Sequence, residues 1–93
     1  MDEFDFGAFI GGYDTFAVSK KHSKKDAIEI AKVEWSIIKR PYYLCVREGF
    51  VRRCAGWRIE YNKKKGSYPC WLFHVAEEEN RGSHCEYECI LVG

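Results

Sequence analysis

The chain has 93 residues, of which 46% are apolar and 16% aromatic, and its formal net charge is +1 at pH 7. This near-neutral charge argues against simple electrostatic attraction to nucleic acid or to a membrane surface. No apolar run approaches the ~20 residues that a membrane-spanning helix needs. The length predicts one small domain, residues 1–93, whose core a few aromatic side chains can close.

The first residues have neither a positively charged segment nor an apolar segment of the kind that makes a secretory signal, so we expect a cytoplasmic protein without a membrane partner. An odd number of cysteines in such a chain favours free, reduced thiols over a disulfide framework. The five cysteines are Cys45, Cys54, Cys70, Cys85 and Cys89.

Two strands, Phe4–Ile10 and Tyr13–Ser19, are predicted to form a hairpin around Gly11-Gly12, because consecutive glycines allow the positive φ angles of a tight turn. A helix is then expected to begin after Ser23, whose hydroxyl suits an N-cap, and to run to about Lys39. Apolar residues cover more than half of this helix, which is more than one flat sheet can bury. Either the sheet curls around the helix, which we favour, or part of the apolar face meets a partner.

The next segment predicts a strand over Tyr42–Arg47, a turn at Glu48-Gly49 and a returning strand from Phe50 that continues past a bulge at Gly56 to Tyr61. From Trp57 to Val92, apolar and polar residues alternate in three runs separated by turn-forming residues. That pattern is typical of a three-stranded antiparallel meander.

The two last strands of the meander are expected at Tyr68–Ala76 and His84–Val92. Centring their turn on Asn80 places Phe73 opposite Tyr87 and Trp71 opposite Cys89. The predicted fold is therefore α+β, an antiparallel sheet of about five to six strands packed on a single helix, in the order ββαββββ.

The sequence contains little that predicts a catalytic site or a metal site. Cys85 and Cys89 are four residues apart in a predicted strand, so their side chains lie ~13 Å apart and cannot both reach one zinc ion. His74 and Glu86 are cross-strand neighbours in the predicted register, where we expect them to form a solvent-facing polar pair. We expect no catalytic residue, no metal site and no cofactor.

Charged runs are the best binding signals. Lysines surround the expected start of the helix, where free N–H groups suit phosphate. A second basic run extends from Arg47 to Arg53, with tyrosines nearby, a composition common to protein interfaces and RNA surfaces. An acidic turn follows the strand that ends at Ala76. The residues that we expect to contact a partner are Lys20, Lys21, Lys24, Lys25, Arg52, Arg53, Glu77, Glu78 and Glu79.

These observations favour a small non-catalytic protein-binding module of the inhibitor type, which acts by occluding the surface of another protein. In size and in its lack of motifs the chain is similar to small inhibitors, immunity proteins and phage-encoded antagonists of host defence. The alternative is a protein that binds nucleic acid or a nucleotide phosphate through the two basic runs, Lys20–Lys25 and Arg47–Arg53. An exposed helix face could also form a symmetric homodimer.

Overall fold

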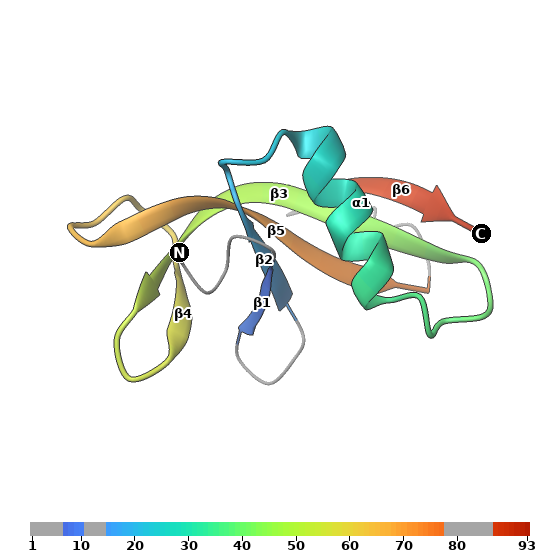
Figure 1. Ribbon diagram of the computed structural model, residues 1–93, viewed down its shortest axis with the longest axis horizontal. Coiled ribbons are helices and arrows are strands. Elements are labelled where there is room, and N and C mark those ends of the chain that lie inside the picture. Colours follow the sequence, from blue (N-terminus) through green and yellow to red (C-terminus); the bar gives the residue numbers. More distant parts are fainter. Residues whose placement is uncertain (1–6, 11–14, 78–86) are drawn as a thin grey trace.

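A computed structural model of the chain describes residues 7–10, 15–77 and 87–93 (Figure 1). In these residues one helix and six strands follow one another in the predicted order ββαββββ, and the α+β class with a curled antiparallel sheet is confirmed. The predicted turn at Gly11-Gly12 lies outside the described residues. The elements are β1 (Ala8–Ile10), β2 (Thr15–Ser19), α1 (Lys24–Glu34), β3 (Tyr42–Arg53), β4 (Trp57–Glu60), β5 (Ser67–Ala76) and β6 (Glu88–Val92).

The helix α1 begins where the sequence predicts. The Ser23 hydroxyl accepts a hydrogen bond from the backbone N–H of Asp26 at 3.2 Å, which satisfies one free N–H group of the first turn. The helix ends at Glu34 rather than at Lys39, so the predicted end is wrong. Trp35 forms the C-cap and turns its indole into the core under the helix, and the chain continues in short turns.

The wide apolar face of α1 is only partly covered. Ala27 and Ala31 are fully buried against the sheet, as the curled-sheet prediction requires. Val33 is 71% exposed, and Ile37, in the turn after the helix, is 81% exposed. The sheet therefore covers one side of the apolar face of α1, while the side chains of Val33 and Ile37 remain at the surface.

Strand β3 is the centre of the sheet, and its two edges are used differently. One edge pairs with β5 along ten residues, and β5 in turn pairs with β2, which pairs with β1. The other edge is shared by β4, opposite Phe50–Arg53, and β6, opposite Tyr42–Val46. Among the described strands β5 pairs with neither β4 nor β6, so the predicted C-terminal meander is wrong.

The predicted turn at Glu48-Gly49 is also wrong, because β3 runs straight through it. Gly49 lies opposite Cys70 on β5, and a Cβ atom at this position would come within 2.5 Å of Leu72 Cδ1. The glycine therefore makes room for a neighbouring side chain. The chain reverses instead between β3 and β4, where the Cys54 N–H donates to the Gly56 carbonyl at 3.0 Å and Gly56 has a φ of 142°.

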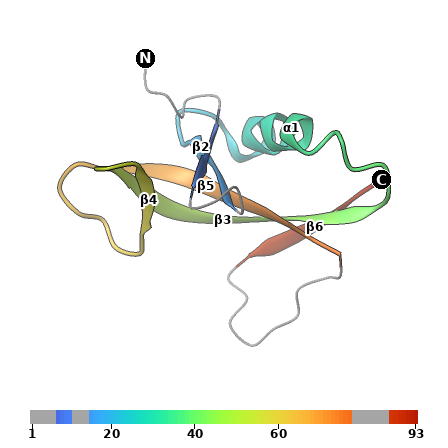
Figure 2. The ribbon, with the colours of Figure 1, turned by 90° about the horizontal axis from the view of Figure 1, so that it is seen from below.

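Hydrophobic side chains pack on both faces of this sheet. Figure 2 shows α1 over one face, where Phe16, Leu44 and Phe73 form the centre of the larger cluster. On the other face Val51 and Leu72 belong to a second cluster, closed where the sheet curls and β1 approaches β4. Trp57 and Ile59 pack on this second cluster and not under the helix.

Candidate binding surface

The largest group of cations lies at the end of β3 that is farthest from α1 (Figure 1). Between Gly49 and Pro69 the chain has six cationic residues and a single carboxylate, so the rest of the chain is net acidic. We call the six residues the basic tip: Arg52, Arg53, Arg58, Lys63, Lys64 and Lys65.

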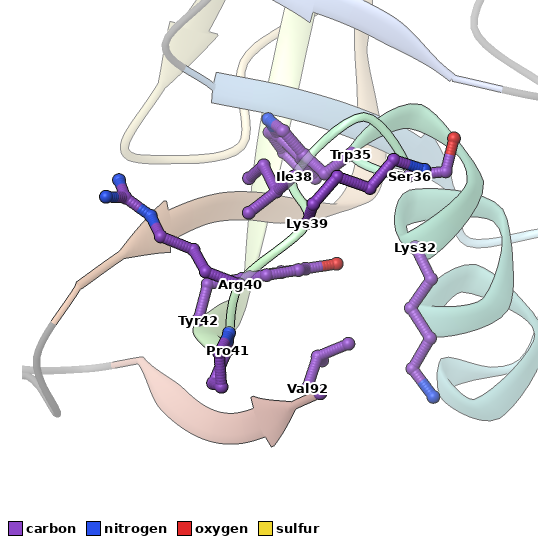
Figure 3. Close-up of a pocket in the computed structure, with 10 residues that line it drawn as sticks. Lys32, Trp35, Ser36, Ile38, Lys39, Arg40, Pro41, Tyr42 and Val92 are labelled. Carbon is purple, nitrogen blue, oxygen red and sulfur yellow. The ribbon is translucent and has the colours of Figure 1, made fainter.

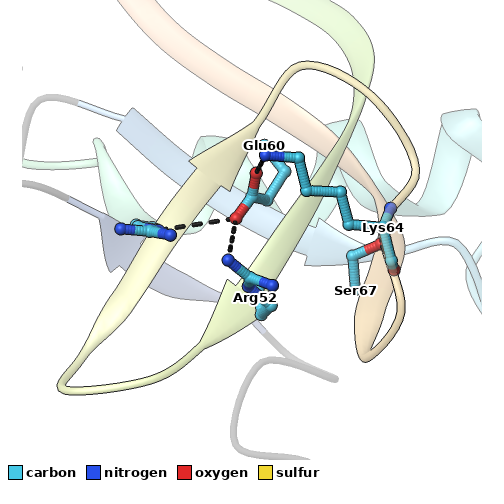
Figure 4. A network of polar contacts seen from close by, with 5 residues as sticks. Arg52, Glu60, Lys64 and Ser67 are labelled. Atoms are coloured by element: carbon cyan, nitrogen blue, oxygen red, sulfur yellow. Dashed lines mark hydrogen bonds and ion pairs between the residues drawn. The ribbon is translucent and has the colours of Figure 1, made fainter.

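The carboxylate of the tip, Glu60, is only 6% exposed and gathers three of these cations around itself (Figure 4). Its Oε1 lies 2.9 Å from Arg52 Nη2 and 3.4 Å from Arg58 Nε, and its Oε2 lies 3.3 Å from Lys64 Nζ. Burial alone raises the pKa of Glu60, but the hydrogen bond from Lys64 and the charges of Lys64, Arg52 and Arg58 outweigh it, and the pKa is lowered. The carboxylate is therefore ionised at neutral pH and holds the cations side by side.

This arrangement leaves hydrogen-bonding capacity unused. Among the described residues neither Glu60 Oε1 nor Arg52 Nε has a hydrogen-bond partner, although both atoms are buried. The contact between these two side chains is therefore an ion pair without a well-formed hydrogen bond. The turn beside it is better ordered, because the Lys64 backbone N–H donates to Ser67 Oγ at 2.9 Å.

Aromatic rings lie beside the cations of the tip. The rings of Trp57 and Tyr68 meet edge to face with their centres 6.1 Å apart, and the Arg53 guanidinium lies 5.7 Å from the centre of the Trp57 ring. Tyr61, just after β4, is 81% exposed. The tip therefore presents arginine, lysine, tyrosine and tryptophan together at one end of the molecule.

The first predicted run, at the start of α1, is largely engaged within the chain. Lys20 Nζ lies 2.7 Å from Glu48 Oε1 and 4.7 Å from the centre of the Trp71 ring. Lys24 forms an ion pair with Glu88. A hollow of about 400 Å³ lies between α1, β3, β5 and β6, and its lining includes Lys24, Glu48 and Glu88. Two of the four lysines are thus neutralised by carboxylates, which weakens the expected attraction for phosphate.

The structure does not bring the three predicted runs together. Lys21 and Lys25 are exposed at the start of α1, whereas Arg52 and Arg53 lie at the end of β3. The acidic turn is described only at its first residue, Glu77, which forms an ion pair with Arg40; Glu78 and Glu79 lie outside the described residues.

A second hollow, of about 360 Å³, lies beside the end of α1 and the turn that follows it (Figure 3). The start of β3 and the end of β6 form its other side. Its apolar lining includes Trp35, Ile38 and Val92. Figure 3 shows Arg40 extending away from Lys32 and Val92, in keeping with its ion pair to Glu77. None of the described side chains that line this hollow is a carboxylate, an imidazole or a thiol.

The neighbours of His74 and Cys89 differ from those that the predicted meander gave them. His74 lies opposite Cys45 on β3, and its predicted neighbour Glu86 is outside the described residues. Burial lowers the pKa of His74 and raises the pKa of Cys70 to about 12, which makes Cys70 a poor nucleophile at neutral pH. In the described part of the chain no group of three or more Asp, Glu, His or Cys side chains could hold a metal ion.

The sequence-based prediction did not include Glu60, because its partners meet it only through the pairing of β3 with β4 and the loop that follows β4. It also missed Arg58, Lys64 and the Trp57–Tyr68 pair as parts of one surface. The sequence did contain a signal for this surface, because residues 49–69 have six cations and a single carboxylate. That signal does not depend on how the strands pair.

No known protein family matches the sequence, and neither a curated protein nor a solved structure shows significant similarity to the chain. Within residues 7–10, 15–77 and 87–93, no helix is both long and apolar enough to cross a membrane.

Proposed function

We propose that the protein is a non-catalytic binding module whose basic tip docks on an acidic surface of another protein and occludes it, as a small inhibitor does. The observation that carries this proposal is the clamp of Arg52, Arg58 and Lys64 around the buried carboxylate of Glu60. Long cationic side chains lose rotamer freedom when they bind a partner. Cations that are already held in place lose less, and the binding free energy is correspondingly more favourable.

The composition of the tip supports a protein partner. Arginine, tyrosine and tryptophan are the residues most often found as hot spots of protein interfaces. The rings of Trp57 and Tyr68 meet edge to face, and the Arg53 guanidinium lies near the Trp57 ring, so arginine and two aromatic rings form one surface. The cations of the rim then steer an acidic partner to this surface and set its orientation.

Nucleic acid is the second candidate, because cations beside exposed aromatic rings can also bind a single strand. Proteins that bind single strands use a charged groove that follows the backbone. Here the cations lie at the end of β3, on β4 and in the loop between β4 and β5, at one end of the molecule (Figure 1). The lysines that could extend a phosphate track, Lys20 and Lys24, are paired with carboxylates. These contacts favour a compact acidic protein surface over an extended strand.

The test is a pull-down from the lysate of the organism that encodes the chain. It uses the purified protein, with and without nuclease, at low and at high salt. The tip variant carries Arg53→Glu and Lys65→Glu, which avoid the three cations bound to Glu60. The matched control carries Lys21→Glu and Lys25→Glu, which make the same change in net charge on the first run. Circular dichroism of both variants checks that the fold is kept.

We expect a discrete protein that survives nuclease, is retained by the control, and is bound at least tenfold more weakly by the tip variant. Loss of binding in the control alone would move the site to the first run. Recovery of nucleic acid that is released by salt would replace the proposal with the second candidate, because release by salt reports phosphate contacts.

A further inference from the structure

Cys45 and Cys89 form a pair of thiols on neighbouring strands. They lie directly opposite each other in the β3–β6 ladder, 44 positions apart in the chain, with their Sγ atoms 2.9 Å apart. Both residues are reduced cysteines in this structure. The pairing of β6 with β3 rather than with β5 is what brings these two sulfur atoms together.

The backbone geometry at this pair is suited to a disulfide. Directly opposite residues of antiparallel strands have Cα atoms about 4.5 or about 5.5 Å apart, depending on their place in the hydrogen-bond pattern. Both separations fall within the range of roughly 4.4–6.8 Å found across disulfides. A bond can therefore form by small rotations of the two side chains, without a shift of either strand.

The two thiols differ in access to solvent. Cys45 is fully buried in the central strand, between Cys89 on β6 and His74 on β5. Cys89 is only partly buried, on a strand that pairs with β3 alone among the described strands. A dissolved small molecule can therefore reach Cys89 first, and Cys45 can react only with what Cys89 has already bound.

We propose that Cys45 and Cys89 are a redox-active dithiol that reduces low-molecular-weight disulfides such as oxidised glutathione and becomes a cross-strand disulfide. The Cys89 thiolate attacks one sulfur of the small disulfide, forms a mixed disulfide and releases one small thiol. The Cys45 thiolate then attacks Cys89 Sγ and releases the second small thiol. Two electrons pass from the protein to the small disulfide, and each protein thiol gives up one proton.

The other described cysteines are not placed for this reaction. Cys70 is buried and burial raises its pKa to about 12, so it has little thiolate at neutral pH. Cys54 is exposed in the β3–β4 turn, at the end of β3 opposite to Cys45. Cys54 can form a mixed disulfide with a small thiol, and it serves as the matched control.

The test follows the thiols by mass spectrometry. Trypsin places Cys45 in peptide 40–47 but leaves Cys85 and Cys89 together in peptide 82–93, so the experiment uses the Cys85→Ser variant. The reduced protein is incubated with oxidised glutathione, quenched in acid, alkylated and digested. We expect the two peptides to be joined, the intact protein to lose two hydrogens, and two molecules of glutathione to be released per chain.

Thermal unfolding gives a second readout. Closing this long loop should raise the Tm of the oxidised protein by about 10–20 °C relative to the reduced protein. The increase should persist in Cys54→Ser and disappear in Cys89→Ser, each made in the Cys85→Ser background. Because Cys89 is partly exposed, its replacement by serine should leave the reduced fold intact.

A stable mixed disulfide of Cys89 with glutathione in the folded protein, with Cys45 still available for alkylation after unfolding, would overturn the proposal. So would recovery of the two peptides unjoined, with Cys45 and Cys89 still reduced after incubation with oxidised glutathione.

Discussion

The ammonium of Lys20 and the carboxylate of Glu48 form an ion pair of 2.7 Å that joins the segment before α1 to the middle of β3. Lys20 also lies over the ring of Trp71, the residue opposite Glu48 on β5. The hydrogen bond and the charge of Lys20 lower the pKa of Glu48, with a smaller contribution from the charge of Lys24. This pair is therefore a structural contact between the segment before α1 and the sheet.

The first prediction concerns this contact. Lys20→Met keeps the apolar stem but removes the charge, so it should lower the free energy of unfolding at neutral pH more than Lys21→Met does. The pKa of Glu48 is lower in the folded protein than the unfolded value of 4.5, so the ionised carboxylate stabilises the fold above that pH. This contribution is lost as the pH falls through the folded pKa. The difference in stability between the two variants should therefore shrink in acid. Urea unfolding of both variants at several pH values below neutrality measures this. Equal stability of the two variants at pH 7 would show that the ion pair contributes nothing.

Glu48 and Gly49 also show that a local sequence pattern does not always predict whether the chain turns. A Glu-Gly pair between two apolar runs carries the signals of a turn. The structure uses Gly49 differently, because the register of β5 brings Leu72 against it. That register is set by residues more than twenty positions away in the chain, so no local pattern can distinguish the two uses of the glycine.

Features that depend on neighbours in sequence were predicted well. The Ser23 cap needs only the N–H of Asp26, and the apolar run of β5 identifies a buried strand whatever its partners are. Pairing between strands is a different matter. The predicted meander assumes that consecutive strands pair. In the structure β4 and β6 both pair with β3. The contact of Cys45 with Cys89 results from the pairing of β6 with β3.

The second prediction concerns His74 and pH. His74 faces Cys45 across the sheet, and its ring meets the edge of Tyr87 with the centres 4.2 Å apart. Because burial lowers its pKa below 6.5, the folded protein disfavours the protonated form, and the unfolded chain binds more protons just below that pH. The free energy of unfolding should therefore fall as pH decreases below 6.5, with a slope of at most about 1.4 kcal/mol per pH unit from one proton.

His74→Gln should reduce this dependence between pH 5 and pH 6.5, as measured by denaturant unfolding. His22→Gln is the matched control, because His22 takes part in the fold through its backbone carbonyl, which accepts a hydrogen bond from Trp71 Nε1 at 3.2 Å. If the two variants show the same pH dependence as the unmodified protein, His74 is not the group that titrates.

The third prediction tests the helix cap. Ser23→Ala removes the acceptor of the Asp26 N–H and should lower the free energy of unfolding by about 1 kcal/mol, or the Tm by roughly 4–8 °C. Ser36→Ala, in the exposed turn after the helix, should change it by less than about 0.5 kcal/mol. Thermal unfolding followed at 222 nm compares them. A loss of equal size in both would mean that serine at position 23 does not act as a cap.

The last prediction separates backbone strain from packing at two glycines. Gly7 and Gly56 both have positive φ angles, 106° and 142°, so alanine strains the backbone at either site by about 1–3 kcal/mol. A Cβ at Gly56 meets nothing within 4 Å, whereas a Cβ at Gly7 would lie 1.8 Å from Phe16 Cζ. The Phe16 ring is buried and also packs against Trp35, with centres 5.9 Å apart, so it cannot move aside without opening the core.

We therefore expect Gly7→Ala to lower the free energy of unfolding by at least about 1–3 kcal/mol more than Gly56→Ala does. Adding Phe16→Leu to each variant provides the decisive comparison in denaturant unfolding. Leucine costs stability in the Gly56→Ala background, because it leaves a cavity in the core, but it should cost much less in the Gly7→Ala background, where it also relieves the clash. Additive losses in both backgrounds would show that the chain before β1 does not lie against the Phe16 ring.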